Sequence, residues 1–169
     1  MNAIDYALKM ELDGKALYEQ QAKNSTDPRL KQLFSMLARD EQRHYEIIEG
    51  FKKSSYDYKG TDTFKTTKNM FSEMLDKKQT FKVETNVFDA YRQAIEMEKK
   101  SVELYLSEST KSKNAQEKSV LLKLAEEEKK HQTILENLTE FVRKGEEWVE
   151  SAEFTHLDEF DKFTQRDKY

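Results

Sequence analysis

The chain has 169 residues, of which 37% are charged and 36% hydrophobic, with a formal net charge of −4 and no cysteine. This length suits one well-buried domain, and the absence of cysteine excludes disulfides, thiolate catalysis and Cys-ligated iron or zinc. The two signs of charge are interspersed, and we find neither an apolar run near 18 residues nor a signal pattern, so we expect a cytoplasmic protein without a nucleic-acid or membrane partner.

Four long segments carry apolar residues at alternating three- and four-residue spacing, which is typical of amphipathic helices. Only four glycines and one proline occur, a composition that favours long helices over strands. The first turn is marked by Asp27, which suits an N-cap, and by Pro28, which suits the first helical position. We expect helices at 2–24, 27–54, 86–112 and 115–143.

Residues 55–85 connect the two helical pairs and are too many for a tight turn. A 28-residue helix spans about 42 Å, so this connection can run the length of a bundle, and we expect a short amphipathic segment at 69–75 within it. Two helical hairpins joined by one long crossover form the ferritin-like arrangement. We therefore predict an all-α fold with a ferritin-like four-helix bundle at 1–143. An aromatic tail at 144–169 is expected to form a short helical segment that packs on the bundle or on a partner.

The two helical pairs repeat one pattern at a fixed offset of 87 residues. Residues 1–54 laid over 88–141 give 14 identities without a gap, where chance gives roughly 3 or 4. Such a repeat indicates two copies of one structural unit. Each copy contains a glutamate followed by a Glu-x-x-His pair: Glu11, Glu41 and His44 in the first, and Glu98, Glu128 and His131 in the second.

The spacing of these residues predicts that they meet. In each copy the two glutamates lie 15 residues before and after the turn, so in an antiparallel hairpin they share one height, about 22 Å from the turn. Each histidine follows its glutamate by one helical turn on the same face. We therefore expect all six side chains to point inward at mid-bundle.

Four carboxylates in apolar stripes are costly unless they are paired or coordinated. Two divalent cations would balance them, and a set of oxygen and nitrogen donors without thiolate suits iron or manganese. One Glu-x-x-His pair on a helix is common without any metal, but two level-matched copies favour a metal site. The other residues of the 126–130 run, apart from Glu128, are expected to form a solvated face.

Three further residues are candidates for supporting roles. Tyr18 and Tyr105 follow Glu11 and Glu98 by two helical turns, so they either hydrogen-bond a ligand carboxylate, supply a redox-active phenol, or are core tyrosines. His156 also ends a Glu-x-x-His pair but has no repeated counterpart, and we interpret it as a packing or helix-end residue rather than a ligand.

The chain resembles the rubrerythrin-like branch of the ferritin-like di-iron carboxylate proteins. The resemblance covers residues 2–142 and rests on Ala-x-x-x-Glu with Tyr seven residues on, followed by Leu-Ala-x-x-Glu-x-x-His, in both copies. It implies a four-helix bundle that holds two irons. Two features differ: the chain lacks the cysteines of a rubredoxin domain, and Ser101 stands where rubrerythrins have an additional carboxylate. The six-ligand set is therefore also similar to the ferroxidase centre of bacterioferritins.

The resemblance implies a non-haem di-iron oxidoreductase that reduces hydrogen peroxide or dioxygen, a role in oxidative stress. Two iron ions, or Fe/Mn or Mn/Mn pairs, are the expected cofactors. An external electron-donor protein and a homodimeric partner are also expected. Two alternatives stay open: a ferroxidase or iron-handling protein, and a metal-binding bundle without catalytic turnover.

Overall fold

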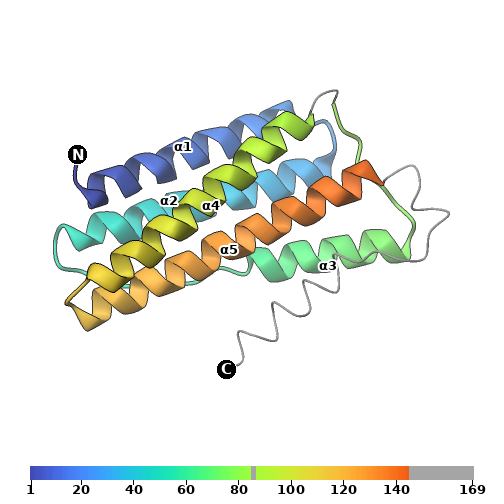
Figure 1. The fold of residues 1–169 in the computed structure, drawn as a ribbon. Helices are drawn as coiled ribbons and strands as arrows, with labels where there is room; N and C mark the ends of the chain where they lie inside the picture. Colours follow the sequence, from blue (N-terminus) through green and yellow to red (C-terminus); the bar gives the residue numbers. More distant parts are fainter. Residues whose placement is uncertain (85–86, 145–169) are drawn as a thin grey trace.

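The computed structural model describes residues 1–84 and 87–144, and within this part every regular element is a helix (Figure 1). The predicted all-α fold is thereby confirmed. The helices are α1 (Ala3–Asn24), α2 (Pro28–Phe51), α3 (Thr63–Asp76), α4 (Val87–Lys111) and α5 (Ala115–Arg143). The tail predicted at 144–169, with His156, lies outside the described residues except for Lys144.

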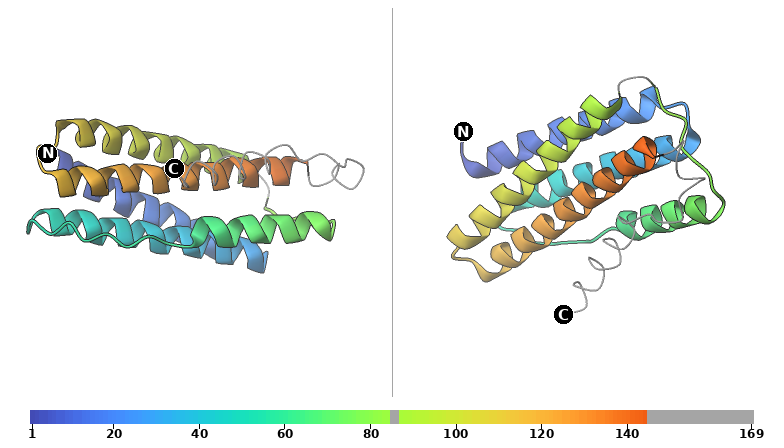
Figure 2. Two further views of the ribbon diagram at one scale, coloured as in Figure 1. Left: turned by 90° about the horizontal axis from the view of Figure 1, so that it is seen from below. Right: turned by 45° about the vertical axis from the view of Figure 1, so that its right-hand side comes forward.

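Two helical hairpins form the bundle. α1 packs along α2, α4 packs along α5, and α1 also contacts α4 across the two hairpins (Figures 1 and 2). The connection after α2 runs back along the bundle before it reaches α4, and α3 lies within it. The long crossover thus spans the bundle as its length predicted.

Polar side chains cap α1, α2 and α5 at their N-termini. Asn2 accepts a hydrogen bond from the amide of Asp5 at the start of α1. Asp27 caps α2 with Pro28 at the first position, and Asn114 accepts from two amides at the start of α5. These caps satisfy amides that a helix leaves free at its N-terminus, so they define where each helix begins.

The crossover differs from the sequence-based boundaries in two places. α2 ends at Phe51 instead of residue 54, because the amide of Ser55 turns back to the carbonyl of Gly50 and Ser54 adopts a positive φ of 56°. A side chain at Gly50 would press on the carbonyl of Ser55. The helix expected at 69–75 covers Thr63–Asp76, so it is longer than its apolar residues alone indicated.

The core consists of two apolar clusters at opposite ends of the bundle. The first surrounds Phe34 and Tyr91 near the α1–α2 turn, and the second surrounds Ile48 and Leu121 near the α4–α5 turn. On α2 and on α5 the predicted ligands lie between the residues of the two clusters. A polar layer therefore separates the two apolar halves.

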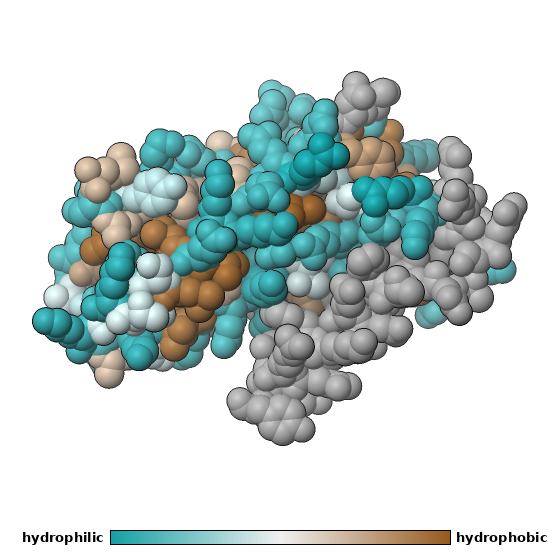
Figure 3. Space-filling view, viewed as in Figure 1, coloured by the Kyte–Doolittle hydropathy of each residue, from teal (hydrophilic) through white to brown (hydrophobic). Residues whose placement is uncertain are grey.

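The surface seen in Figure 3 is mainly hydrophilic, with apolar side chains gathered where the C-terminal half of α4 meets the N-terminal half of α5. Leu106 and Leu122 on these helices are exposed. No helix in the described ranges is long and apolar enough to cross a membrane.

Candidate metal centre

The structure brings all six predicted ligand residues together in the polar layer between the apolar clusters. Each is at most 3% exposed, although four of them are carboxylates. α1 and α4 each contribute one glutamate, and α2 and α5 each contribute a Glu-x-x-His pair. The level-matching of the hairpins therefore places the six side chains at one height, while metal ligation itself stays a prediction.

The six residues form two overlapping groups of donors, and the donor atoms within each group lie within 4.8 Å of one another. One group combines Glu11 and His44 with Glu41 and Glu128. The other combines Glu98 and His131 with the same two glutamates. Each group could hold one ion, and Glu41 and Glu128 are positioned to contact both.

Both histidines direct Nδ1 toward the predicted ligand glutamates. Nδ1 of His44 lies 3.0 Å from Glu128 Oε1 and 3.5 Å from Glu11 Oε2. Nδ1 of His131 lies 2.9 Å from Glu41 Oε1 and 3.2 Å from Glu128 Oε2. The rings stack with centroids 5.6 Å apart. Nδ1 is thus the nitrogen available to a metal ion on each ring.

The opposite nitrogen of each histidine contacts an acidic residue that the sequence analysis did not single out. His44 Nε2 lies 2.6 Å from Glu127 Oε2, and His131 Nε2 lies 3.0 Å from Asp40 Oδ2. A carboxylate at this position fixes the tautomer and orientation of a metal-binding imidazole. Each acidic residue comes from the other hairpin, so the contacts cross the repeat.

A sequence signal for these two residues was present. Asp40 and Glu127 occupy equivalent repeat positions, each directly before a predicted ligand glutamate, and both are acidic. The expectation that the 126–130 run forms a solvated face is wrong for Glu127, which is 7% exposed. The helix turns this residue toward α2, where His44 offers a hydrogen-bond partner that solvent would otherwise supply.

The crossover supplies a further layer of hydrogen bonds. The hydroxyl of Tyr58 donates to Glu127 Oε1 at 2.5 Å, and the hydroxyl of Thr61 donates to Asp40 Oδ2 at 3.3 Å. The crossover therefore holds the acidic residues that in turn orient the two histidines.

The two predicted supporting tyrosines also cross between the hairpins. Tyr18 on α1 donates its phenolic proton to Glu98 on α4, and Tyr105 on α4 donates to Glu11 on α1. Both side chains are 1% exposed. Burial raises the pKa of each phenol well above its ordinary value, and the nearby carboxylates act in the same direction. Both phenols therefore keep their protons and act as donors to the ligand carboxylates.

Electrostatic strain in the cluster is visible in the pKa values of its members. Burial raises the pKa of Glu41 and Glu128 well above the ordinary value, and repulsion from Glu11 adds to the effect. Burial also opposes ionisation of Glu11, but hydrogen bonding to Glu41 and the charge of His44 outweigh it and lower its pKa to about 2. Burial lowers the pKa of both histidines, but the carboxylates facing them outweigh it and raise it well above the ordinary value. In the absence of cations, the cluster therefore binds protons that offset the negative charge of its carboxylates.

The donor set fits two divalent cations. Three buried carboxylate oxygens lie within 3.5 Å of an imidazole Nδ1 but form no well-aligned hydrogen bond among the described residues, namely Glu11 Oε2, Glu41 Oε1 and Glu128 Oε2. Unpaired oxygens of this kind are costly unless a cation coordinates them. Gly14 leaves room for this arrangement, because a Cβ there would lie 3.1 Å from Glu41 Oε2.

Ser101 lies one turn after Glu98, at the repeat position of Gly14. Its hydroxyl donates to the carbonyl of Met97 in its own helix, 3.1 Å away. Neither donor group contains an additional carboxylate from this position. The described part of the chain thus brings together six candidate ligands in two matching sets.

Comparison with known proteins agrees with this arrangement. The family model described as Rubrerythrin matches residues 2–139, which cover all five described helices except the last turn of α5. Comparisons with curated proteins and with solved structures gave no match. The matched range contains the six buried donors and the two tyrosines that hydrogen-bond to them, and the chain belongs to the rubrerythrin family of di-iron carboxylate proteins.

Proposed function

We propose that this protein is a non-haem di-iron oxidoreductase that reduces hydrogen peroxide, or dioxygen, with electrons from an external redox protein. The observation that carries the proposal is the pair of overlapping donor groups that share Glu41 and Glu128. Two ions held this close can act on the two oxygen atoms of one peroxide molecule. Iron is the proposed metal. Fe/Mn or Mn/Mn pairs are alternatives, because manganese binds to the same kinds of donor atom.

Bound iron would supply the two electrons and the Lewis acidity that reduction of peroxide to two waters requires. Glu11 and Glu98 each belong to one donor group, so each would hold one ion. Glu41 and Glu128 belong to both groups and would bridge them. Burial of all four excludes bulk water from the centre, which strengthens every charge interaction within it.

The residues around the donors keep protons in defined places. Nε2 of His44 donates to Glu127 and Nε2 of His131 donates to Asp40 when Nδ1 faces a metal ion. Tyr18 and Tyr105 keep their phenolic protons and donate them in hydrogen bonds to Glu98 and Glu11. These four hydrogen bonds hold the donors in place and leave the shared glutamates free to move as charge changes.

Anaerobic loading with Fe(II) followed by hydrogen peroxide tests the proposal. We expect two irons per chain, a change in the optical spectrum on addition of peroxide, and consumption of one peroxide per two electrons delivered by a reductant. A protein that binds two irons and shows no optical change with peroxide or dioxygen would be a metal-binding bundle without turnover, and the catalytic proposal would be wrong.

A ferroxidase or iron-handling protein is the second candidate, and Ser101 favours it. A serine at this position offers no extra carboxylate for exchange of ligands during peroxide reduction, and its hydroxyl donates to the carbonyl of Met97 in its own helix. Storage needs a hollow multi-subunit shell, so the mass in solution separates the candidates. A particle of many subunits that retains oxidised iron supports storage, whereas a dimer excludes it.

The expected partners are a second copy of the chain and the electron donor. Leu106 on α4 and Leu122 on α5 are exposed, and they support association through the α4–α5 face. Sedimentation of the wild-type protein and of Leu122→Lys tests the homodimer. We expect the variant to dissociate, and an unchanged mass would place the contact elsewhere.

A further inference from the structure

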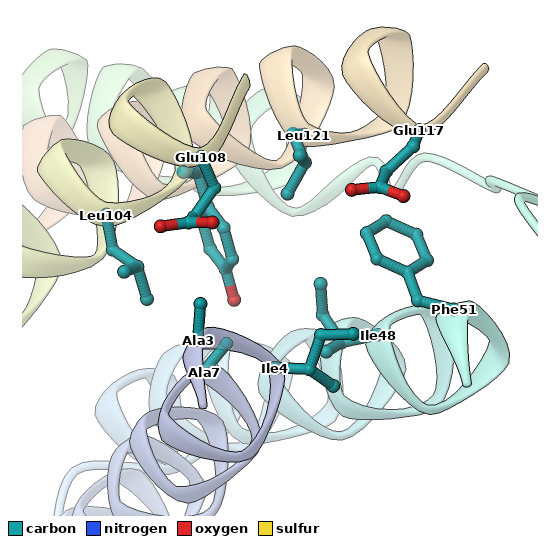
Figure 4. A pocket seen from close by; sticks show the side chains of 10 residues that line it. Ala3, Ile4, Ala7, Ile48, Phe51, Leu104, Glu108, Glu117 and Leu121 are labelled. Atoms are coloured by element: carbon teal, nitrogen blue, oxygen red, sulfur yellow. The ribbon is translucent and has the colours of Figure 1, made fainter. Parts of the chain in front are cut away.

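A recess at one end of the bundle reaches toward the candidate metal centre. It lies between the N-terminus of α1, the C-termini of α2 and α4, and the start of α5, whose side chains point into one space in Figure 4. Its volume is about 30 Å³. Since roughly 10–15 Å³ by this measure holds one water, the recess has room for a molecule of two heavy atoms.

The internal repeat shows how the two ends of the bundle differ. Ile4 and Leu121 line the recess, and their repeat equivalents are Tyr91 and Phe34, whose rings pack with centroids 5.7 Å apart. The opposite end also has a recess, of about 150 Å³, but neither Phe34 nor Tyr18, the repeat equivalent of Tyr105, lines it. The recess at that end therefore stays outside the packed rings, whereas smaller side chains leave the end beside Tyr105 open toward the donors.

Two lining residues connect the recess to the donors. Tyr105 lines it, and the hydroxyl of this residue donates to Glu11. Ala7 also lines it and precedes Glu11 by one helical turn, on the same face of α1. The phenol of Tyr105 is thus in contact with both the recess and a carboxylate of the centre.

We propose that this recess is the binding and entry site for the small neutral oxidant, dioxygen or hydrogen peroxide, on its way to the metal centre. The inference rests on the proposed function and adds the route and the side from which the oxidant arrives. Tyr105 is the last group between the recess and Glu11, so it positions the entering molecule beside the first donor group.

The lining explains why the occupant is neutral. Apart from Tyr105, apolar side chains dominate the recess, and the two charged groups beside them are the carboxylates of Glu108 and Glu117. Carboxylates repel anions, whereas an uncharged molecule passes them without an electrostatic penalty. The recess beside Asp40 is more highly charged, because Arg39, Arg43 and Lys59 line it together with Asp40 and Asp62.

Dissolved dioxygen provides a test that is independent of turnover, because its paramagnetism relaxes nearby methyl groups in NMR spectra. The protein is loaded with Zn²⁺, which has no redox chemistry. Ile48 lines the recess, and its repeat equivalent Leu135 does not, although the two are equally buried at 1% and 0% exposure. We expect stronger relaxation at Ile48 than at Leu135, and equal relaxation would overturn the proposal.

Leu121→Phe closes the recess with the ring that Phe34 provides at the other end. Leu12→Phe, the same change at an exposed position of α1 that does not line the recess, is the matched control. We expect Leu121→Phe to abolish the excess relaxation at Ile48 and to slow the reaction of Fe(II)-loaded protein with peroxide about tenfold, equivalent to about 1.4 kcal/mol of added barrier. Leu12→Phe should change neither quantity.

Ile4→Phe closes the half-buried rim and serves where Leu121→Phe folds poorly. If both fillings leave relaxation and peroxide rate unchanged, the entry site is wrong while the proposed function stands. If wild-type protein shows the relaxation at Ile48 but no reaction with either oxidant, the proposed function is wrong and the recess is a binding site for small neutral molecules. A slower reaction with dioxygen but not with peroxide assigns the recess to dioxygen alone.

Discussion

The two apolar halves of the bundle differ far more than the polar layer between them. The half near the α1–α2 turn is filled with rings: Phe34 packs on Tyr91, and Phe71 of α3 stacks on Phe141 at 5.5 Å. In the half near the α4–α5 turn, Ile4 and Leu121 stand in place of Tyr91 and Phe34, and the recess there reaches Tyr105. The two copies of the repeat thus share the same donor residues at the centre of the bundle and differ in the apolar residues toward its ends.

This difference assigns separate roles to the two halves. α3 and the rings around Phe71 give one half a core rich in aromatic contacts, which stabilises the polar layer, and the recess at this end does not reach Tyr18. The opposite half has aliphatic side chains in place of rings and leaves space beside the centre. A buried site needs both a rigid support and an access route. Here the half around Phe71 supplies the support, and the half beside Tyr105 supplies the access route.

The largest expected effect comes from removing a shared glutamate. Glu128→Ala takes a carboxylate from both donor groups, whereas Glu11→Ala takes one from a single group. We expect Glu128→Ala to lose both metal ions and Glu11→Ala to retain one, as measured by metal analysis after dialysis. The metal-free Glu128→Ala protein should unfold at the same or a higher temperature than metal-free wild type, because a buried carboxyl group with poorly paired oxygens has been removed.

The opposite ranking, in which Glu11→Ala loses both ions and Glu128→Ala keeps one, would show that Glu128 does not contact both ions. Glu41→Ala is the repeat-related control and should behave as Glu128→Ala does, since the centre is equivalent in the two copies.

The next effect comes from the acidic residues that orient the histidines. Asp40→Asn and Glu127→Gln keep the shape of the side chain but replace the carboxylate that accepts from Nε2. Loss of such a partner typically weakens metal binding about 10–100-fold. Competition with a chelator measures the affinity. Tyr58→Phe, which removes only the outer hydrogen bond to Glu127, should have a much smaller effect.

Equal affinities for wild type and both variants would indicate that Asp40 and Glu127 serve only the packing of α2 against α5. A change in one variant alone would instead show that the two donor groups depend unequally on their support.

Much of the fold followed from the sequence, because it rests on periodicity and on a repeat. The apolar spacing predicted the four long helices, and Asp27 with Pro28 marked the start of α2 within one residue. The equal distances of Glu11 and Glu41 from their turn predicted the height at which they meet, since the rise per residue of a helix is fixed.

The rest depended on contacts between elements, which spacing alone does not determine. Whether Glu127 faces solvent or α2 depends on how the hairpins pack, and the orientation of the crossover decides that Tyr58 reaches it. Likewise the recess exists because Ile4 and Leu121 are smaller than their repeat equivalents. The sequence alone does not show that these two side chains line the same space.

The pH dependence of stability separates the metal-free from the metal-loaded centre. Glu41, Glu128 and both histidines have raised pKa values, so the folded metal-free protein binds more protons than the unfolded chain above the ordinary glutamate pKa of 4.5. The stabilisation that these groups contribute is fully present below their ordinary pKa and is lost as the pH rises through the raised values. We expect the free energy of unfolding of metal-free protein to fall between pH 5 and 8, by about 1.4 kcal/mol per pH unit for each extra proton bound.

Cations must displace these protons, so metal affinity should rise with pH over the same window, and binding should release protons into a weakly buffered solution. Glu11 and Glu98 do not change this sign, because their pKa values are lowered and both are ionised throughout the window. Chemical denaturation at a series of pH values measures the slope. A metal-free protein that grows more stable from pH 5 to pH 8 would contradict the proton count.

The smallest expected effects compare Gly14 with its repeat equivalent Ser101. Gly14→Ala adds a Cβ 3.1 Å from Glu41 Oε2, closer than ordinary contact, so this shared carboxylate must shift by a few tenths of an ångström. Replacing a helical glycine by alanine contributes about 0.5–1 kcal/mol of stability. We therefore expect metal-free Gly14→Ala to be as stable as wild type or slightly more so, with metal affinity reduced because Glu41 is displaced.

Ser101→Ala is the control, because this position already has a Cβ and its hydroxyl bonds only to the carbonyl of Met97. We expect a change in unfolding free energy within about 0.5 kcal/mol and no change in metal affinity. If Ser101→Ala lowers affinity as Gly14→Ala does, the serine hydroxyl takes part in the centre and the two copies differ there as well as at their ends. If neither variant changes affinity, Glu41 shifts without loss of binding and the prediction for Gly14→Ala is wrong.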